Sequence, residues 1–287
     1  MSRLDNRWFG HETWIQRHKR LSVGLFVIAI LLFILVLGYI YRDELKMVSG
    51  FGATSKTENE KTAEKEDAAD GDKGSAETEV SPIDPNKPMI ALTFDDGPSM
   101  YTDQLLDKLK ECNARATFYM VGQNVRKYPD TVKRIAEMRC EIGNHTYNHV
   151  KLTELAPEQM QAEIESTNQA LAEVLGYGAK TVRPTYGSVN DEVKNHVAYP
   201  FVMWSVDTTD WQKEDAASVV NYVLETVQDG DIVLFHDIHG ITVEAMMTLI
   251  PALQDRGYQL VTVSEMAEAR GVIMESGQKY FKFKIQN

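Results

Sequence analysis

The chain has 287 residues, of which 43% are hydrophobic and 25% are charged, which is ordinary for a globular protein. This length allows one sizeable domain with additional segments. The formal net charge of -12 disfavours nucleic acid as a partner, because phosphate binding relies on clustered Lys and Arg side chains. Neutral or acidic polymers stay open as substrates.

Residues 21–41 form an apolar run without a charged side chain. A helix of about 20 residues, rising about 1.5 Å per residue, spans a hydrocarbon core of about 30 Å. A cleaved signal peptide is the alternative, but its apolar region is shorter, about 7–15 residues, and no small-residue cleavage site follows this run. Basic residues dominate the charges of residues 1–20, and an acidic segment follows the run. The positive-inside rule therefore predicts a single-pass protein of the cell membrane, with a cytoplasmic N-terminus and an extracytoplasmic remainder.

Residues 42–87 are dominated by Glu, Lys, Asp, Ala, Ser, Thr and Gly, and they offer almost nothing that could be buried. We predict a disordered acidic linker with a reach of roughly 35–40 Å or more. Such a linker would let a domain search a layer outside the membrane, such as a cell wall. A solubilising spacer without meaning for the substrate has the same composition.

From Pro88 onward, short apolar runs alternate with helical patterns, which is typical of repeated β-α units and a largely parallel sheet. The predicted strands are residues 89–94, 116–121, 140–143, 180–183, 201–206, 231–235 and 259–262. The predicted helices are residues 102–112, 129–138, 157–175, 216–228 and 242–256. These elements predict one domain at 88–270, followed by a tail at 271–287 whose aromatic and Lys residues alternate as in a strand.

Acidic and imidazole side chains follow several predicted strands in short motifs, namely Thr93-Phe94-Asp95-Asp96-Gly97, His145-Thr146-Tyr147-Asn148-His149, Asp207-Thr208-Thr209-Asp210-Trp211 and Leu234-Phe235-His236-Asp237. Loops that follow parallel strands converge on one face of a barrel, so these motifs are expected to meet. One carboxylate and two His residues spaced by four can hold a divalent metal, while a further Asp and His can act as base and acid. The pattern predicts a metal hydrolase.

Each motif has a simpler interpretation when it is taken alone. An isolated His-x-x-x-His is more often a surface pair on a helix, and Asp-Asp-Gly-Pro has the composition of a turn. A lone His at a strand end is more often a hydrogen-bonded core residue. The placement of all these motifs at strand ends favours a shared site.

Cys112 and Cys140 each precede a strand, and the two strands are expected to be neighbours. A disulfide is chemically allowed outside the cytosol, and it requires Cα atoms within about 7 Å. Two unpaired thiols are the alternative. Neither Cys is expected to act as a nucleophile or a metal ligand.

Together with Arg183-Pro184-Thr185-Tyr186-Gly187, the four motifs resemble, in order, the five motifs of the polysaccharide deacetylase family (NodB homology, carbohydrate esterase family 4). The resemblance covers residues 88–268. It implies a distorted (β/α) barrel and metal-dependent removal of acetyl groups from N-acetylated sugars.

By this resemblance, Asp96, His145 and His149 are the metal ligands. One oxygen and two imidazole nitrogens suit Zn²⁺ and also accept Co²⁺ or another first-row metal. Asp95 resembles the catalytic base of the family, which the metal and Arg183 would hold ionised so that it accepts a proton from the attacking water.

His236 resembles the general acid that protonates the departing amine, with Asp210 orienting its ring. His239 is the competitor for this role, and the position in the motif favours His236. Trp204 and Leu234 lie where the family has a small pocket for the acetyl methyl group, although core packing explains them equally.

The resemblance also assigns an oxyanion donor to the backbone N–H of Tyr186. Here the sequence departs from the family, which has a second Pro where this chain has Thr185. The change frees one backbone dihedral beside the donor, so we expect an effect on rate and none on reaction type.

We therefore expect an enzyme that removes N-acetyl groups from a glycan outside the membrane, releasing acetate. Anchoring beside the wall makes N-acetylglucosamine of peptidoglycan the leading substrate. N-acetylmuramic acid, a chitin-like oligomer and an exopolysaccharide are alternatives within the class. A membrane-tethered, non-catalytic glycan-binding module and a structural wall protein are alternatives from other classes, but binding alone does not need a charge-tuned acid and base.

Overall fold

The structure is a computed structural model, and it describes residues 82–284. The predicted membrane helix at 21–41 and the predicted linker up to residue 81 lie outside these residues. Between residues 82 and 284, no helix has both the length and the apolar character that crossing a bilayer requires. Residues 82–87, which we assigned to the linker, contact the domain, because Asp84 and Gln259 exchange two hydrogen bonds of 2.8 Å.

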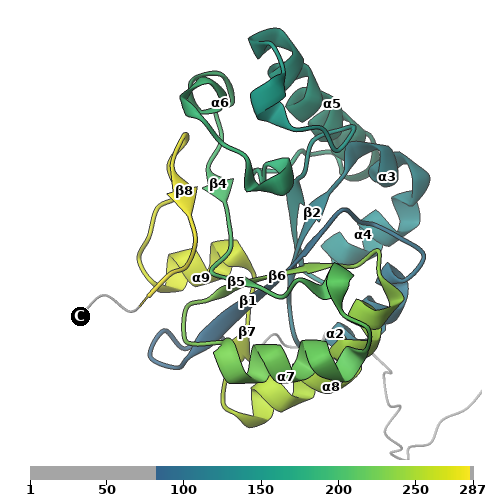
Figure 1. Cartoon of the computed structure of the whole chain (residues 1–287), viewed down its shortest axis with the longest axis vertical. Helices are drawn as coiled ribbons and strands as arrows, with labels where there is room; N and C mark the ends of the chain where they lie inside the picture. The colour runs from purple at the N-terminus through teal and green to yellow at the C-terminus, as the bar shows by residue number, and fades with distance from the viewer. Residues whose placement is uncertain (1–81, 285–287) are drawn as a thin grey trace, which may run out of the picture. The chain divides into compact units, whose positions relative to one another are not determined.

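A parallel sheet lies at the centre of the domain (Figure 1), and its strand order is β3-β2-β1-β6-β5, with β7 pairing the start of β1. The central strand β1 (Met89–Asp95) is buried along its whole length, which explains why its sequence is a nearly continuous apolar run. The other strands of this sheet are β2 (Thr117–Met120), β3 (Glu141–Asn144), β5 (Val206–Asp207), β6 (Ile232–His236) and β7 (Gln259–Leu260).

Short pairings continue the sheet beyond β3 and curve it toward a barrel. Single-residue parallel bridges join Asn144 to Val182 and Val182 to Phe201. From there β4 (Phe201–Val202) pairs with β8 (Lys279–Tyr280), and the two strands lie side by side in Figure 1. This geometry agrees with the expected distorted barrel, which is regular on one side and built from short strands on the other.

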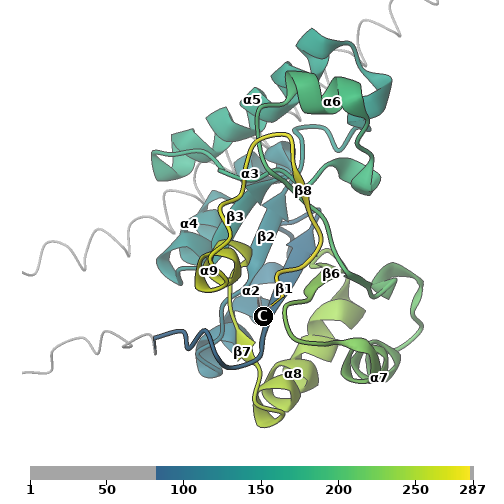
Figure 2. The same ribbon diagram turned by 90° about the vertical axis from the view of Figure 1, so that its left-hand side faces the viewer.

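The C-terminal tail packs on this short-stranded side, a role that the sequence left open. An antiparallel bridge pairs Asp231 with Lys282. Phe283 is buried, and its N–H donates to the carbonyl of Gly230 over 2.9 Å. Figure 2 shows the tail crossing in front of the strands.

Two predicted strands differ from the observed ones. The strand predicted at 180–183 is reduced to the bridges of Val182. The strand predicted at 201–206 is divided into β4 and β5, because the chain changes partners within it: Met203 N–H donates to Tyr280, whereas Ser205 N–H donates to Ile232.

Five helices match the predicted ones, and Gly176 ends the longest in the expected left-handed conformation (φ 83°). These are α2 (Thr102–Glu111), α4 (Pro129–Glu137), α5 (Pro157–Leu175), α7 (Ala216–Thr226) and α8 (Gly240–Asp255). Among residues 82–284, three further α-helices were not predicted, namely α3 (Gly122–Lys127), α6 (Asp191–His196) and α9 (Val263–Ala269). They are too short for a repeating apolar pattern, although the capping box of Thr262 and Glu265 marks the start of α9.

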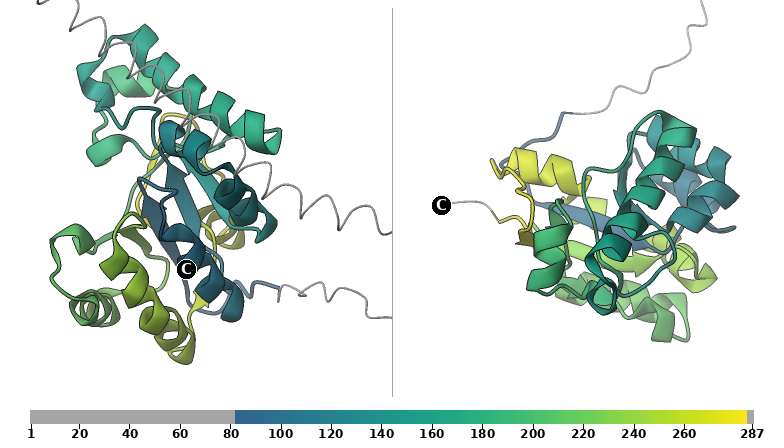
Figure 3. Two further views of the ribbon diagram at one scale, coloured as in Figure 1. Left: turned by 90° about the vertical axis from the view of Figure 1, so that its right-hand side faces the viewer. Right: turned by 90° about the horizontal axis from the view of Figure 1, so that it is seen from above.

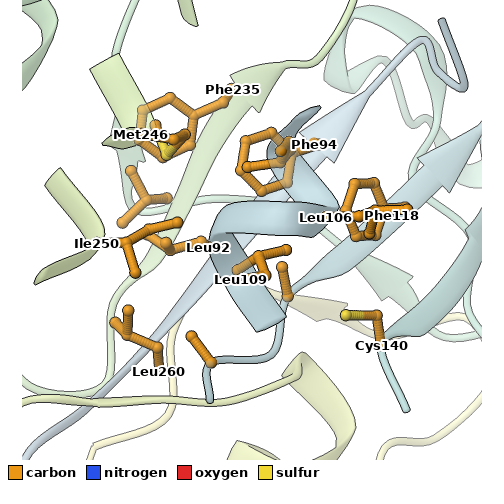
Figure 4. Packing of buried hydrophobic residues seen from close by; sticks show 14 of the residues in the cluster. Leu92, Phe94, Leu106, Leu109, Phe118, Cys140, Phe235, Met246, Ile250 and Leu260 are labelled. Carbon is orange, nitrogen blue, oxygen red and sulfur yellow. The ribbon is translucent and has the colours of Figure 1, made fainter. Parts of the chain in front are cut away.

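The helices cover the outer side of the strands. Figure 3 shows α2 in front of the strands, with α7 and α8 to one side of it and α3 and α4 to the other. Inside this layer, the Phe94 ring stacks between Phe118 and Phe235, with centroid distances of 5.3 and 5.5 Å (Figure 4). Leu106 from α2 and Met246 from α8 belong to the same core. This packing fixes the ends of β1, β2 and β6 relative to one another.

The disulfide between Cys112 and Cys140 is not formed, and both residues are free thiols. The strands that follow them do pair, as expected. However, Cys112 lies beside α8, where its carbonyl accepts a hydrogen bond from Gln254, while Cys140 is buried beside β2 with its N–H bonded to Ile135. Burial raises the pKa of the Cys140 thiol to about 11, so this thiol is unreactive at neutral pH.

Candidate metal and catalytic site

A pocket of about 610 Å³ lies at the carboxyl ends of the parallel strands. The predicted motifs meet here because each one directly follows a strand or bridge of the curved sheet. Asp95 and His236, for example, are direct neighbours in the register of β1 and β6. The pocket is lined by Asp95, Asp96, His145, His149, Tyr186, Trp204, Asp207, Trp211, Leu234, His236 and His239.

The three predicted metal ligands form one cluster, with their ligand atoms within 4.8 Å of one another. Asp96 Oδ1 lies 3.0 Å from His149 Nε2 and 3.3 Å from His145 Nε2. This oxygen is buried, and within residues 82–284 it makes no hydrogen bond of normal geometry. Burial alone would raise the pKa of Asp96, yet the two imidazoles hold that pKa below the usual range. One carboxylate oxygen and two ring nitrogens that converge in this way fit a divalent cation.

The hydrogen bond of His145 selects the ring nitrogen that faces the cluster. Its Nδ1 lies 2.6 Å from the carbonyl oxygen of Arg183, which can only accept, so Nδ1 carries the proton and Nε2 is left as the ligand atom. Burial lowers the pKa of His145, but the nearby carboxylates of Asp95 and Asp96 raise it overall.

Arg183 is fully buried and holds Asp95 in place. Its Nη1 donates to Asp95 Oδ1 (2.8 Å) and to Thr93 Oγ1 (2.7 Å), while Nε and Nη2 donate to two backbone carbonyls. The guanidinium carbon lies 4.2 Å from the centre of the Tyr119 ring. Asp95 Oδ2 is left facing the cluster, 3.8 Å from His145 Nε2. Sequence reasoning identified Arg183 and Asp95 but assigned no role to Thr93, the first residue of its motif, or to Tyr119, which lies outside the motifs.

His236 is paired with Asp210 as predicted. His236 Nδ1 lies 2.8 Å from Asp210 Oδ1, and the backbone N–H of His236 donates to Asp210 Oδ2 over 2.8 Å. Thr242 Oγ1 also donates to Oδ2, over 2.6 Å. Burial opposes a charge on the His236 ring, but the hydrogen bond and charge of Asp210 raise its pKa to about 9. Burial likewise works against the Asp210 carboxylate, and its hydrogen bond with His236 lowers its pKa. The His236 ring is therefore charged at neutral pH.

His239, the competing candidate acid, also lines the pocket. Its ring centroid lies 6.2 Å from that of His236, and of the two imidazole rings it is that of His236 that pairs with Asp210. The geometry favours His236 as the acid.

The three predicted substrate-binding residues are found in the pocket wall. Leu234 is buried and Trp204 half-buried, whereas the Tyr186 side chain is 69% exposed and its ring meets His149 edge-on. Tyr186 has a positive φ of 59°. Asp207 and Trp211 line the same pocket. Both belong to the Asp207–Trp211 motif, but sequence reasoning assigned neither of them a role.

Thr185, where the sequence departs from the family, is fully buried. Its hydroxyl donates a hydrogen bond to the carbonyl of Val150, next to the ligand His149. This bond restrains the loop that the missing Pro would have stiffened, an effect that the sequence alone did not indicate.

Asp237 is the last residue of the Leu234–Asp237 motif, and sequence reasoning assigned it no role. In the structure, its carboxylate packs against Gly97, in the loop that carries Asp96. Thr102 Oγ1 donates to its carboxylate and Ser99 Oγ to its carbonyl. Burial raises the pKa of Asp237 to about 7. A Cβ added to Gly97 would lie 2.2 Å from Asp237 Oδ1, so Gly97 is required for this close approach.

Comparisons with known proteins agree with these motifs. The family model for polysaccharide deacetylase matches residues 83–199. A peptidoglycan-N-acetylmuramic acid deacetylase from Bacillus subtilis is 39% identical over 189 residues, which are 66% of this chain and 40% of that protein. A peptidoglycan-N-acetylglucosamine deacetylase from Bacillus cereus is 39% identical over 189 residues, which are 63% of this chain and 69% of that protein.

Among solved structures, a family 4 acetyl xylan esterase from Clostridium thermocellum in complex with a cobalt ion matches with a TM-score of 0.65 and 33% identity. The match covers 68% of this chain and 98% of that chain. This chain spans only about two fifths of the length of several curated relatives, including the Bacillus subtilis protein.

Proposed function

This chain belongs to the polysaccharide deacetylase family, and from that premise we propose that it is a metal-dependent hydrolase that removes N-acetyl groups from a cell-surface polysaccharide. The observation that carries the proposal is the placement of two differently charged catalytic groups beside the three-ligand cluster. Asp95 is held by the buried Arg183, and His236 by Asp210. Binding alone does not require such a pair.

Asp96, His145 and His149 would hold the divalent ion, Zn²⁺ or another first-row metal such as Co²⁺. When bound there, the ion supplies Lewis-acid polarisation of the acetyl carbonyl and of the attacking water. The fit rests on the converging ligand atoms and on the buried Asp96 oxygen, for which residues 82–284 supply no hydrogen-bond donor of normal geometry.

The protein's own residues then move the protons. Asp95, with one oxygen fixed by Arg183, accepts the proton that water loses as it adds to the carbonyl carbon. The backbone N–H of Tyr186 stabilises the negative oxygen that develops on that carbon. His236 donates its proton to the nitrogen as the C–N bond breaks, which yields acetate and a free amine on the sugar. Trp204 and Leu234 enclose the acetyl methyl group and exclude water from it.

N-acetylglucosamine of peptidoglycan is the proposed substrate, and N-acetylmuramic acid is the main alternative. The two curated relatives described above are named for these two sugars. Incubation of the full chain with purified peptidoglycan, followed by muramidase digestion and mass spectrometry, tests the choice. Loss of one acetyl group from N-acetylglucosamine is expected. Loss from N-acetylmuramic acid alone would contradict the proposed sugar, and unchanged muropeptides would contradict the activity on peptidoglycan.

We further propose that the chain is anchored in the cell membrane, with the deacetylase domain outside. The apolar run at 21–41 and the basic residues before it support this orientation. Protease treatment of intact spheroplasts is expected to digest the domain, and protection of the domain would contradict the orientation.

A further inference from the structure

We propose that Glu163 is a positioning residue for the metal site, because its carboxylate holds the loop that joins the ligands His145 and His149. Glu163 lies on α5, on a different element from either ligand. Its position in the sequence, on one face of an ordinary amphipathic helix, gives no sign of this role. The inference rests on the metal site proposed above.

The carboxylate of Glu163 accepts three hydrogen bonds from the middle of the ligand loop. Oε2 accepts from the backbone N–H groups of Tyr147 (2.9 Å) and Asn148 (2.8 Å), and Oε1 accepts from Asn148 Nδ2 (2.6 Å). A charged acceptor makes these bonds stronger than neutral ones. They fix the 146–147 and 147–148 peptide groups, which lie between the two ligands.

The loop needs such restraint because its backbone is strained at both ends. Thr146 and His149 have positive φ values of 64° and 55°, a region that costs of order 1–3 kcal/mol for residues other than Gly. The strain is greater for Thr146, whose side chain is β-branched. Residues hold such conformations only where surrounding contacts determine them, and they cluster at functional sites.

Other contacts hold the near end of the loop. Asn144 Oδ1 accepts from the N–H of Thr146 (2.9 Å), and the N–H of Gly122 donates to the Thr146 carbonyl (3.0 Å). Gly122 has no room for a Cβ, which would lie 2.4 Å from the Tyr147 ring. Toward His149, Gln123 donates to the Tyr147 carbonyl (3.2 Å) and to Asn148 Oδ1 (2.5 Å), and Thr185 donates to the Val150 carbonyl. Glu163 is the acceptor for the N–H groups of this part of the loop.

His149 is the ligand most in need of this support. The His145 ring is buried and fixed by the Arg183 carbonyl. The His149 side chain lies at the rim of the pocket with 33% of its surface exposed. Its distance to Asp96 therefore depends on the backbone of the loop, and loss of Glu163 would let the ring leave the cluster.

Metal affinity of the full chain, measured in detergent by competition for Co²⁺ with a chromophoric chelator, tests the proposal. Removing an outer partner of a ligand weakens metal binding by about 10–100-fold. We expect Kd to rise about tenfold in Glu163→Gln and toward a hundredfold in Glu163→Ala, with activity recovering as Co²⁺ is increased. Glu173→Gln is the matched control, since Glu173 lies on the same helix and pairs with the exposed Arg126.

A Kd within twofold of wild type in both Glu163 variants, with a lower melting temperature of the metal-free protein, would show a purely structural role and overturn the proposal. If Glu163→Ala does not fold, as judged by circular dichroism, the near-isosteric Glu163→Gln carries the test. Absence of Co²⁺ binding by the wild-type chain would contradict the metal site itself and remove the basis of the proposal.

Discussion

Arg183 and Asp95 form a buried ion pair in which Nη1 lies 2.8 Å from Oδ1 and the guanidinium is fully enclosed. Arg183 also donates to Thr93 and to two backbone carbonyls, so its guanidinium is held by contacts that do not involve Asp95. A base fixed in this way keeps one orientation while its second oxygen faces the pocket.

Replacement of Arg183 by Lys should reduce both activity and stability. A single ammonium cannot make the four planar contacts, and it leaves Asp95 partly unpaired in a buried site. We expect kcat/KM to fall by at least about a hundredfold and the free energy of unfolding by about 3–5 kcal/mol. Acetate release and urea unfolding measure the two effects; a variant with wild-type activity would contradict the role of the pair.

Asp210→Asn should shift the pH dependence of activity. The acid form of His236 is needed, and Asp210 raises the His236 pKa from its usual 6.5 to about 9. Without the carboxylate, this pKa falls, so the alkaline limb of the kcat/KM profile should move to lower pH by at least about one unit. An alkaline limb at the wild-type pH would show that another group limits activity.

The His236–Asp210 pair also makes the free energy of unfolding depend on pH. Because the folded-state pKa of His236 is raised, its contribution to stability is complete below about pH 6.5 and is lost as the pH rises through about 9. Wild type should therefore lose more stability than Asp210→Asn between these two pH values, as measured by urea unfolding. Parallel losses in the two proteins would contradict the assignment.

Thr185→Val should slow the enzyme, while Thr185→Ser should not. Valine keeps the shape but removes the hydroxyl that donates to the Val150 carbonyl, leaving that acceptor without this donor. Loss of this hydrogen bond costs about 1–2 kcal/mol. If the loss raises the activation barrier by displacing the Tyr186 N–H, kcat falls by about tenfold. Equal rates for the two variants would mean that the hydroxyl does not restrain the loop.

Gly97→Ala should destabilise the domain through its contact with Asp237. The added methyl group would overlap Asp237 Oδ1, and overpacking of this kind costs about 1–3 kcal/mol. Asp237→Ser should lower the free energy of unfolding less in the Gly97→Ala background than in wild type. A double-mutant cycle of unfolding free energies measures this difference. Additive losses would contradict the contact.

The sequence predicted those parts of the site that follow long, buried strands. Asp95 and His236 are the last residues of β1 and β6, and Asp96 directly follows β1. Both strands are clear apolar runs in the sequence, so the convergence of these residues followed from the fold class. The sequence could not predict the hydrogen-bonding and packing partners that other elements supply to these site residues. Glu163, Thr242 and Tyr119 have no local pattern that points to the site. The divided strand at β4 and β5 was missed for a related reason, since its break depends on pairing with the distant Tyr280 and Ile232.

Metal-dependent deacetylation is tested most directly by acetate release from N-acetylglucosamine oligomers and peptidoglycan. The release by the full chain is measured with Co²⁺ or Zn²⁺ and again after chelation. We predict release that depends on added metal, is abolished in Asp95→Asn although this variant still binds metal, and is abolished together with metal binding in His145→Ala. Acetate release that persists after complete removal of metal would contradict the metal dependence, and release by Asp95→Asn would contradict the role of Asp95 as the base.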